Sequence, residues 1–177
     1  LPRTYLYAAT FAGLLLLLFG IADLLSLVSR LVIGAPDPVF DSGQQWWSYP
    51  LATALSRVLV GTVAWIGHRW YARRLWTDPT ARGALERQAR PRFAYYVAAL
   101  VVTAAAAIGY LGQGLSGVLD AAFGTLDDVG RVMAELVATL LAAALFAMAW
   151  RIHARWLRAA VAETGGPGRP VGERLVA

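Results

Sequence analysis

The sequence contains no cysteine and no lysine, and it is poor in charged residues. Without cysteine the chain can have no disulfide, no thiolate nucleophile, no iron–sulfur cluster and no thiol-ligated zinc site. Charged residues make up 15% of the 177 positions and apolar residues 58%, whereas a soluble domain usually has about a quarter charged residues. This composition predicts an integral membrane protein, and residues 1–177 have the length of one membrane domain without a second domain.

Residue patterns that support catalysis are also missing. We find no nucleophile beside a base, no glycine-rich phosphate loop and no pair of carboxylates at catalytic spacing. We therefore expect a protein that is not an enzyme and has no cofactor. The net charge of +5 could suggest nucleic acid, but on a chain this apolar it more simply reflects membrane topology, so no nucleic-acid partner is expected.

Four long apolar segments dominate the chain, and each reaches the length of about 20 residues that a transmembrane helix needs. They cover about 5–33, 51–75, 93–119 and 128–160. Thr125 and Asp128 resemble a capping box at the start of the last segment. The pattern predicts an all-α membrane protein with four transmembrane helices.

Arginine is unevenly distributed between the connections. Seven arginines lie between positions 69 and 92, whereas 34–50 contains no basic residue and 120–130 is acidic without arginine. Because cytoplasmic loops carry the excess of basic residues, the connection between the second and third helices is predicted to face the cytoplasm. Both termini then lie on the same side, and the expected location is a bacterial inner membrane.

The basic linker, 76–91, is predicted to contain a short surface helix. Asp78 followed by Pro79 indicates the N-cap and the first helical residue. After the fourth helix, 161–177 is predicted to be a flexible tail, because it is rich in glycine and proline.

The sequence divides into two similar halves, 3–75 and 92–160, on either side of this linker. Matching positions are Pro2 with Pro91, Gly20 with Gly109, Trp65 with Trp150, and His68 with His153. Each half contains two spans, so both halves enter the membrane in the same orientation. The sequence thus predicts two tandem helical hairpins related as parallel repeats.

Several short motifs carry a resemblance to a known family. They are the Tyr5-x-Tyr7 start, the Val60-Gly61-x-x-x-Trp65-x-x-His68-x-Trp70 run, the Glu86-Arg87 pair and the closing His153. Together they resemble a family of uncharacterised bacterial membrane proteins with four spans, over about 3–157. The second half departs from the pattern, because Arg155 precedes Trp156 and displaces the second tryptophan by one position. The resemblance implies a fold and a membrane location, but no activity.

His68 and His153 are the residues that could suggest a cofactor. Two imidazoles at similar depth on two helices could ligate one haem inside a helical bundle. Each histidine, however, follows a tryptophan by three positions and precedes arginine-rich sequence, which is typical of an anchor at the membrane interface. We expect both to keep their polar edges in water at the cytoplasmic interface and to bind no metal or haem.

Asp23, Arg57 and Glu135 are ionisable residues within or near the spans, where such groups mark a partner or a pathway. Counting the helical rise places Asp23 roughly 27 Å from Tyr5 and the long side chain of Arg57 roughly 16 Å from His68, both in the outer half of the membrane. Arg57 is therefore predicted to reach Asp23 and form a structural ion pair. Arg30 and Arg131, near the outer ends, are expected to extend toward water.

Small residues on the third span predict a packing face. Ala105, Gly109, Gly112 and Ser116 follow one another at helical spacing, and such a stripe permits close approach of helices. We expect Gly109 and Gly112 to face another helix.

Three functions are compatible with these features. The first is a non-enzymatic membrane subunit that associates with copies of itself or a larger complex and contacts lipids, including anionic headgroups at the cytoplasmic face. The second is a small channel or transporter component with Asp23, Arg57 and Glu135 along a polar path. The third is an electron-transfer subunit with haem between His68 and His153.

Single-cysteine labelling tests the topology directly in this cysteine-free chain. Cysteines replacing Arg3, Arg82 or Arg169 should react from the cytoplasmic side, and cysteines replacing Asp41 or Asp127 from the external side, because of the arginine asymmetry. Reaction of position 41 with a cytoplasmic reagent alone would reverse the assignment.

Overall fold

The structure, a computed structural model, describes residues 3–33, 47–124 and 129–164, where α-helices joined by short turns are the regular secondary structure. The helices are α1 (Arg3–Ile33), α2 (Ser48–Trp76), α3 (Ala81–Arg87), α4 (Arg90–Ala122) and α5 (Val129–Thr164). The four long helices are each long and apolar enough to cross a membrane, which confirms the predicted all-α class with four candidate spans. The proposed capping box, the tail and positions 41, 127 and 169 lie outside the described residues.

The short helix in the basic linker exists, but it begins later than expected. Asp78 is not its N-cap: the carboxylate oxygen Oδ1 accepts the backbone N–H of Thr80 at 2.8 Å, which closes a turn around Pro79 before α3 starts at Ala81. Pro91 lies in the first turn of α4, where a missing N–H removes no helical hydrogen bond.

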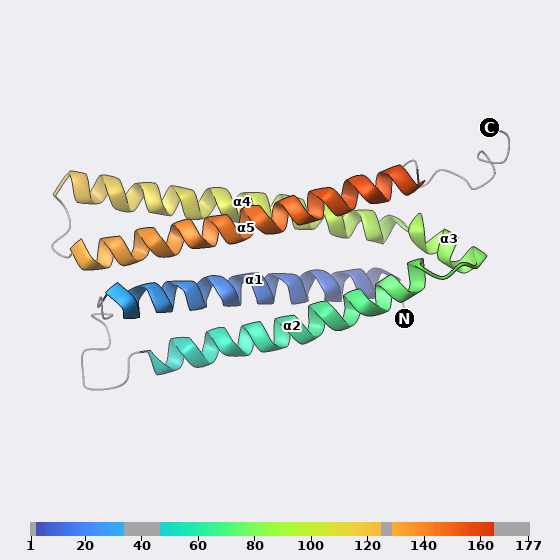
Figure 1. Ribbon diagram of the computed structural model, residues 1–177, viewed down its shortest axis with the longest axis horizontal. Coiled ribbons are helices and arrows are strands. Elements are labelled where there is room, and N and C mark those ends of the chain that lie inside the picture. Colours follow the sequence, from blue (N-terminus) through green and yellow to red (C-terminus); the bar gives the residue numbers. More distant parts are fainter. Residues whose placement is uncertain (1–2, 34–46, 125–128, 165–177) are drawn as a thin grey trace.

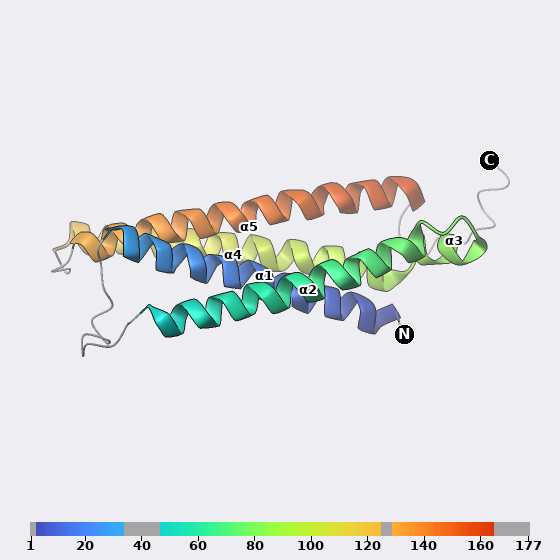
Figure 2. The ribbon, with the colours of Figure 1, turned by 60° about the horizontal axis from the view of Figure 1, so that its bottom comes forward.

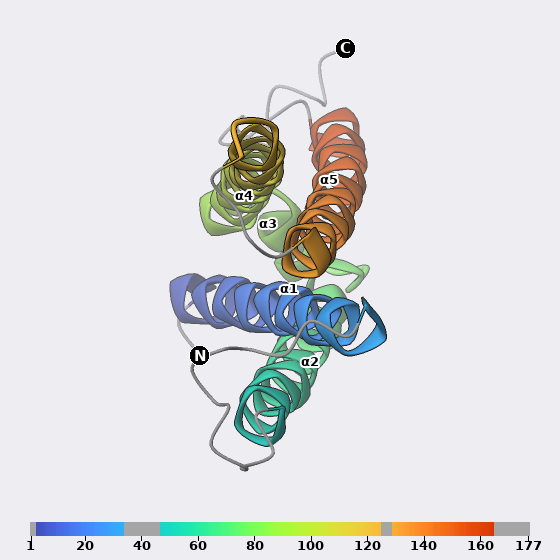
Figure 3. The same cartoon turned by 90° about the vertical axis from the view of Figure 1, so that its left-hand side faces the viewer.

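The long helices run up and down beside one another (Figure 1). The start of α1, helix α3 and the end of α5 share one end of the molecule, which we call the α3 end; the opposite end is the loop end. Viewed along the helices, α1 lies between α2 and the hairpin of α4 and α5 (Figure 3). Figure 2 shows α2 crossing α1, and α2 packs on little else than α1 and α3.

Three glycines bring the backbones of α1 and α2 into contact. A Cβ at Gly13 would lie 2.6 Å from the backbone nitrogen of Trp65, and one at Gly20 would lie 2.9 Å from that of Val58. On α2, a Cβ at Gly61 would lie 2.9 Å from the carbonyl oxygen of Gly13. These separations are shorter than van der Waals contact, so only glycine permits the approach.

The other side of α1 packs against α4 and α5. Leu14 and Leu18 of α1 and Phe146 of α5 are buried between the hairpins. The ring centroid of Phe146 lies 5.1 Å from that of Phe19 and 5.6 Å from that of Tyr110, with which it stacks. These side chains form an apolar layer in the middle of the molecule.

The two halves do not pack alike, although their sequences match. Gly20 lies against the backbone of α2, but a Cβ at its counterpart Gly109 would meet nothing within 4 Å. His68 and His153 do share one local feature, since the Nδ1 atom of each bonds to the carbonyl oxygen four residues earlier. The two histidine segments therefore share this local bond, but the helices that carry Gly20 and Gly109 pack differently.

A glycine pair on α2 tests the close contact with α1. Gly61→Ala should lower stability by about 1–3 kcal/mol, because its methyl group would press against the backbone of α1. The control Gly67→Ala adds the same group to the same helix in open space and should be neutral or stabilising. Thermal unfolding in mild detergent measures both, and equal midpoints would contradict the close contact.

Candidate functional site: a buried polar network at the α3 end

Glu86 on α3 is a buried carboxylate, 3% exposed, beside the start of α1. Its Oε1 atom accepts a hydrogen bond from the Tyr7 hydroxyl at 3.1 Å, and its Oε2 atom lies 2.9 Å from Nε of Arg3. A buried carboxylate is costly unless it is paired and hydrogen-bonded, and here both oxygens have partners. Glu86 thereby links α3 to α1.

A chain of three hydrogen bonds, two of them between helices and the third within α5, connects α2, α4 and α5. Trp65 Nε1 donates to the hydroxyl of Tyr95 at 3.3 Å, and this hydroxyl lies 3.0 Å from Nε2 of His153. His153 Nδ1 lies 2.8 Å from the carbonyl oxygen of Ala149. Because a carbonyl only accepts, Nδ1 carries the hydrogen and, in the neutral ring, Nε2 accepts the hydrogen of Tyr95. A single arrangement of hydrogens satisfies all three bonds.

Aromatic rings cover this chain. The edge of His153 meets the ring of Trp156 at a centroid distance of 4.9 Å. The guanidinium carbon of Arg69, from α2, lies 3.6 Å from the centroid of Trp156, which is a close cation–π contact. Arg69 thus adds a second connection between α2 and α5.

Arg92, 4% exposed at the start of α4, is the third buried group at this end. Its Nη1 donates to the carbonyl oxygen of Arg87 at 3.2 Å, and Nη2 lies 3.7 Å from Glu163 on α5. The guanidinium also lies over the ring of Trp76, 4.6 Å from its centroid. We call the groups centred on Glu86, Tyr95–His153 and Arg92 the α3-end network.

At the loop end, the predicted pair of Asp23 and Arg57 is confirmed. Nη1 of Arg57 donates directly to Oδ2 of Asp23 and forms a salt bridge between α1 and α2. The pair is partly exposed, and its value for stability is therefore modest.

Glu135 belongs to a separate cluster at the same end. It lies 3.7 Å from Arg30 and 3.6 Å from Arg131, so both arginines turn toward this carboxylate instead of simply extending outward as expected. Glu135 and Asp23 line one cavity of about 330 Å³ between α1, α4 and α5, but Arg57 is not among its lining residues. The structure therefore places Asp23 and Glu135 at one cavity, and Arg57 joins this group through its salt bridge with Asp23.

The expected placement of His153 is wrong. Its side chain is buried, 2% exposed, and both ring nitrogens have partners within the protein, so its polar edge is not in water. The reason is Tyr95, which meets the ring from the preceding helix. His68 is only partly buried and has the ring of Tyr5 near it, with centroids 6.2 Å apart.

Gly109 and Gly112 do not pack against another helix of this chain, and their packing against a helix of a second copy stays a prediction. A Cβ at either position would meet nothing within 4 Å. Helix α4 instead turns Ala99 and Thr103 inward, both fully buried, and Gly114, where a Cβ would lie 2.8 Å from the hydroxyl of Thr139 on α5. The small-residue stripe consequently points away from the other helices.

Sequence reasoning missed Glu86 and Tyr95 as the centres of the network. The sequence did mark Glu86 as an acidic residue among seven arginines and as part of the Glu86-Arg87 motif. Tyr95 gave no signal beyond being one of two adjacent tyrosines.

The α3-end network is suited to holding helices in place. Within the described residues, no group of three or more histidine, aspartate or glutamate side chains could hold a metal ion. An iron at His153 would have to displace the Tyr95 hydroxyl from Nε2. The hydrogen bonds and ion pairs of the network join residues of α1 to α5.

Matched tyrosine variants test the hydrogen-bond chain. Tyr95→Phe should lower stability by about 1–3 kcal/mol, because it leaves Nε2 of His153 and Nε1 of Trp65 without their partner. The control is Tyr96→Phe, since this buried neighbour has a hydroxyl that bonds to no other described side chain. Denaturation in detergent measures both variants, and equal losses would show that the chain has no special role.

Comparison with known proteins supports the resemblance noted in the sequence. No match exists among curated proteins or among solved structures. One family model matches residues 3–149, which include α1 to α4 and most of α5. The match covers most of the chain, and the protein therefore belongs to the family described as domain of unknown function DUF5671.

Proposed function

We propose that this protein is a non-enzymatic integral membrane subunit that associates with a second copy of itself through α4. Its four long helices are the transmembrane spans, two tandem hairpins with both termini and α3 on the cytoplasmic side of a bacterial inner membrane. Exposed arginines at the α3 end, such as Arg73, Arg74 and Arg82, support this orientation and favour contact with anionic headgroups.

The outer face of α4 is the observation that carries self-association. Ala105, Gly109, Gly112 and Ser116 are all exposed, and Gly109 and Gly112 have open space around them. Their spacing of four, three and four residues averages about 3.7, close to the 3.6-residue turn of a straight α-helix, so the four small residues lie on one face. A lipid-facing helix gains nothing from such a stripe, whereas a partner helix can approach it closely.

The distribution of polar groups supports a subunit over a channel. Asp23 and Glu135 line the cavity at the loop end, while the α3-end network lies at the other end. Between them, the buried side chains of Leu14, Leu18 and Phe146 form an apolar layer. A path for ions or polar solutes would need polar groups at this depth as well.

Native mass measurement in mild detergent tests the proposal. We expect a defined oligomer, and Gly112→Leu should shift it to monomer because the added side chain holds the second α4 away. The matched control is Gly67→Leu, an equally open glycine on α2, which should leave the oligomer intact. A wild-type monomer, or an oligomer unchanged by Gly112→Leu, would exclude association through α4.

A further inference from the structure

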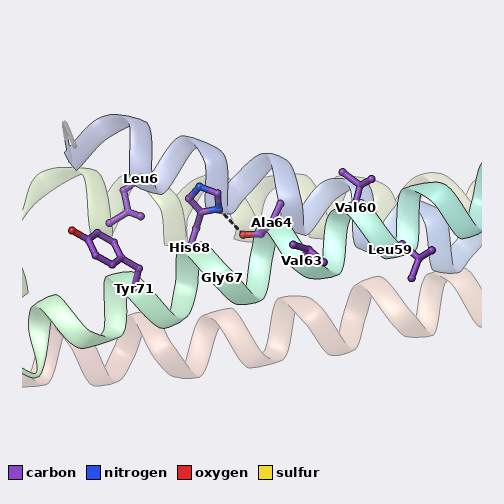
Figure 4. A pocket seen from close by; sticks show the side chains of 8 residues that line it. All are labelled: Leu6, Leu59, Val60, Val63, Ala64, Gly67, His68 and Tyr71. Carbon is purple, nitrogen blue, oxygen red and sulfur yellow. Dashed lines mark hydrogen bonds between the residues drawn. The ribbon is translucent and has the colours of Figure 1, made fainter.

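An apolar trough of about 710 Å³ runs along the exposed side of α2. Figure 4 shows Leu59, Val63 and Gly67 following one another along α2, Tyr71 at one end, and Leu6 of α1 on the opposite wall. Nothing within 4 Å covers the position where a side chain on Gly67 would lie. The trough is therefore open along most of its length.

The trough continues into a basic pocket at the α3 end. This second pocket, about 400 Å³, is lined by Arg74 and Arg82, and Tyr71 belongs to both pockets. Asp78 also lines it, but its Oδ1 already accepts the backbone N–H of Thr80, and two arginines outnumber this one carboxylate. Tyr71 thus lies where the apolar surface meets the cationic site.

The dimensions of the trough fit one lipid chain. From Leu59 to Tyr71 the helix rises about 18 Å, at 1.5 Å per residue. Half of a bilayer core is about 15 Å thick, so a chain extending inward from a headgroup at Tyr71 would end near Leu59. The exposed ring of Trp70 lies at the same level as this headgroup position, as aromatic rings do at membrane interfaces.

We propose that the trough and the basic pocket together bind one anionic phospholipid of the cytoplasmic leaflet. Its acyl chain lies along Leu59, Val63 and Gly67, and its phosphate lies between Arg74 and Arg82. The inference rests on membrane insertion with a cytoplasmic α3 end, as proposed above, but not on self-association through α4.

The combination of an apolar trough and a basic pocket favours a lipid over a helix from a second copy. A transmembrane helix of a second copy would fill the apolar part, but Glu86 and Glu163 at its α3 end already pair with arginines of their own chain. The self-association stripe on α4 also lies on a different helix. A phospholipid satisfies both parts at once, because guanidinium groups pair well with phosphate oxygens.

The test is native mass spectrometry of the full chain in mild detergent with phosphatidylglycerol and phosphatidylcholine of identical acyl chains. We expect bound phosphatidylglycerol to exceed phosphatidylcholine. The double variant Arg74→Gln, Arg82→Gln should reduce this binding roughly twenty-five-fold, since each arginine near an anionic lipid contributes about fivefold. The control Arg151→Gln, Arg158→Gln removes the same charge from exposed positions on α5 and should have little effect.

A second pair of variants tests the apolar part. Gly67→Leu should reduce lipid binding and leave the oligomer unchanged, whereas Gly112→Leu should do the opposite. Equal binding of both lipids, equal losses in the two arginine variants, or unchanged binding in Gly67→Leu would each overturn the proposal. Displacement of phosphatidylglycerol by glycerol phosphate, which has no acyl chain, would also overturn the proposal. So would loss of a bound second protein chain in Gly67→Leu, because the trough would then hold a protein helix. The same mass spectra also show the oligomeric state, so a failure of the proposed self-association can be distinguished from a failure of lipid binding.

Discussion

The backbones of α1 and α2 meet at Gly13 and Gly61 without a side chain between them, and this contact fixes where α2 lies. Because the contact is so close, Arg57 reaches Asp23 on one side of it, and Trp65 reaches Tyr95 of the second hairpin on the other. Helix α1 is covered by α2 on this face and by α4 and α5 on the opposite face. Because α1 lies in the centre, the apolar layer forms around its middle and the polar groups gather at the α3 end and the loop end.

Much of the fold could be predicted from the sequence, because four apolar segments of sufficient length leave few alternatives. The pair of Asp23 and Arg57 was also predictable, since counting the helical rise places both residues in the outer half of the membrane, where the long arginine side chain can reach the carboxylate. Which face of α4 turns inward was not predictable. Faces toward lipid and toward protein are both apolar in such helices, and small residues at Gly109 and Gly112 mark a packing face without saying which chain supplies the partner.

The α3-end network was less accessible to sequence reasoning, because its bonds join residues far apart in the chain. Tyr7 and Glu86 are 79 positions apart, and Tyr95 and His153 are 58 apart. The same Trp-x-x-His motif also ends in different surroundings in the two halves. A tyrosine hydroxyl meets His153, whereas His68 lies at an open trough. In both places the motif sets the local bond from Nδ1 to a backbone carbonyl, whereas the partner of Nε2 depends on the tertiary structure.

The directional bonds from Trp65 through Tyr95 to His153 give the hairpins a specific register. Apolar helix surfaces pack almost equally well in several sliding positions, so shape alone selects weakly among them. A slide of α5 by one helical turn, about 5.4 Å, would carry the imidazole out of reach of the tyrosine hydroxyl and leave buried donors without acceptors. These two bonds between helices therefore contribute uniqueness of alignment more than total stability, and they allow an otherwise apolar interface to settle in one position.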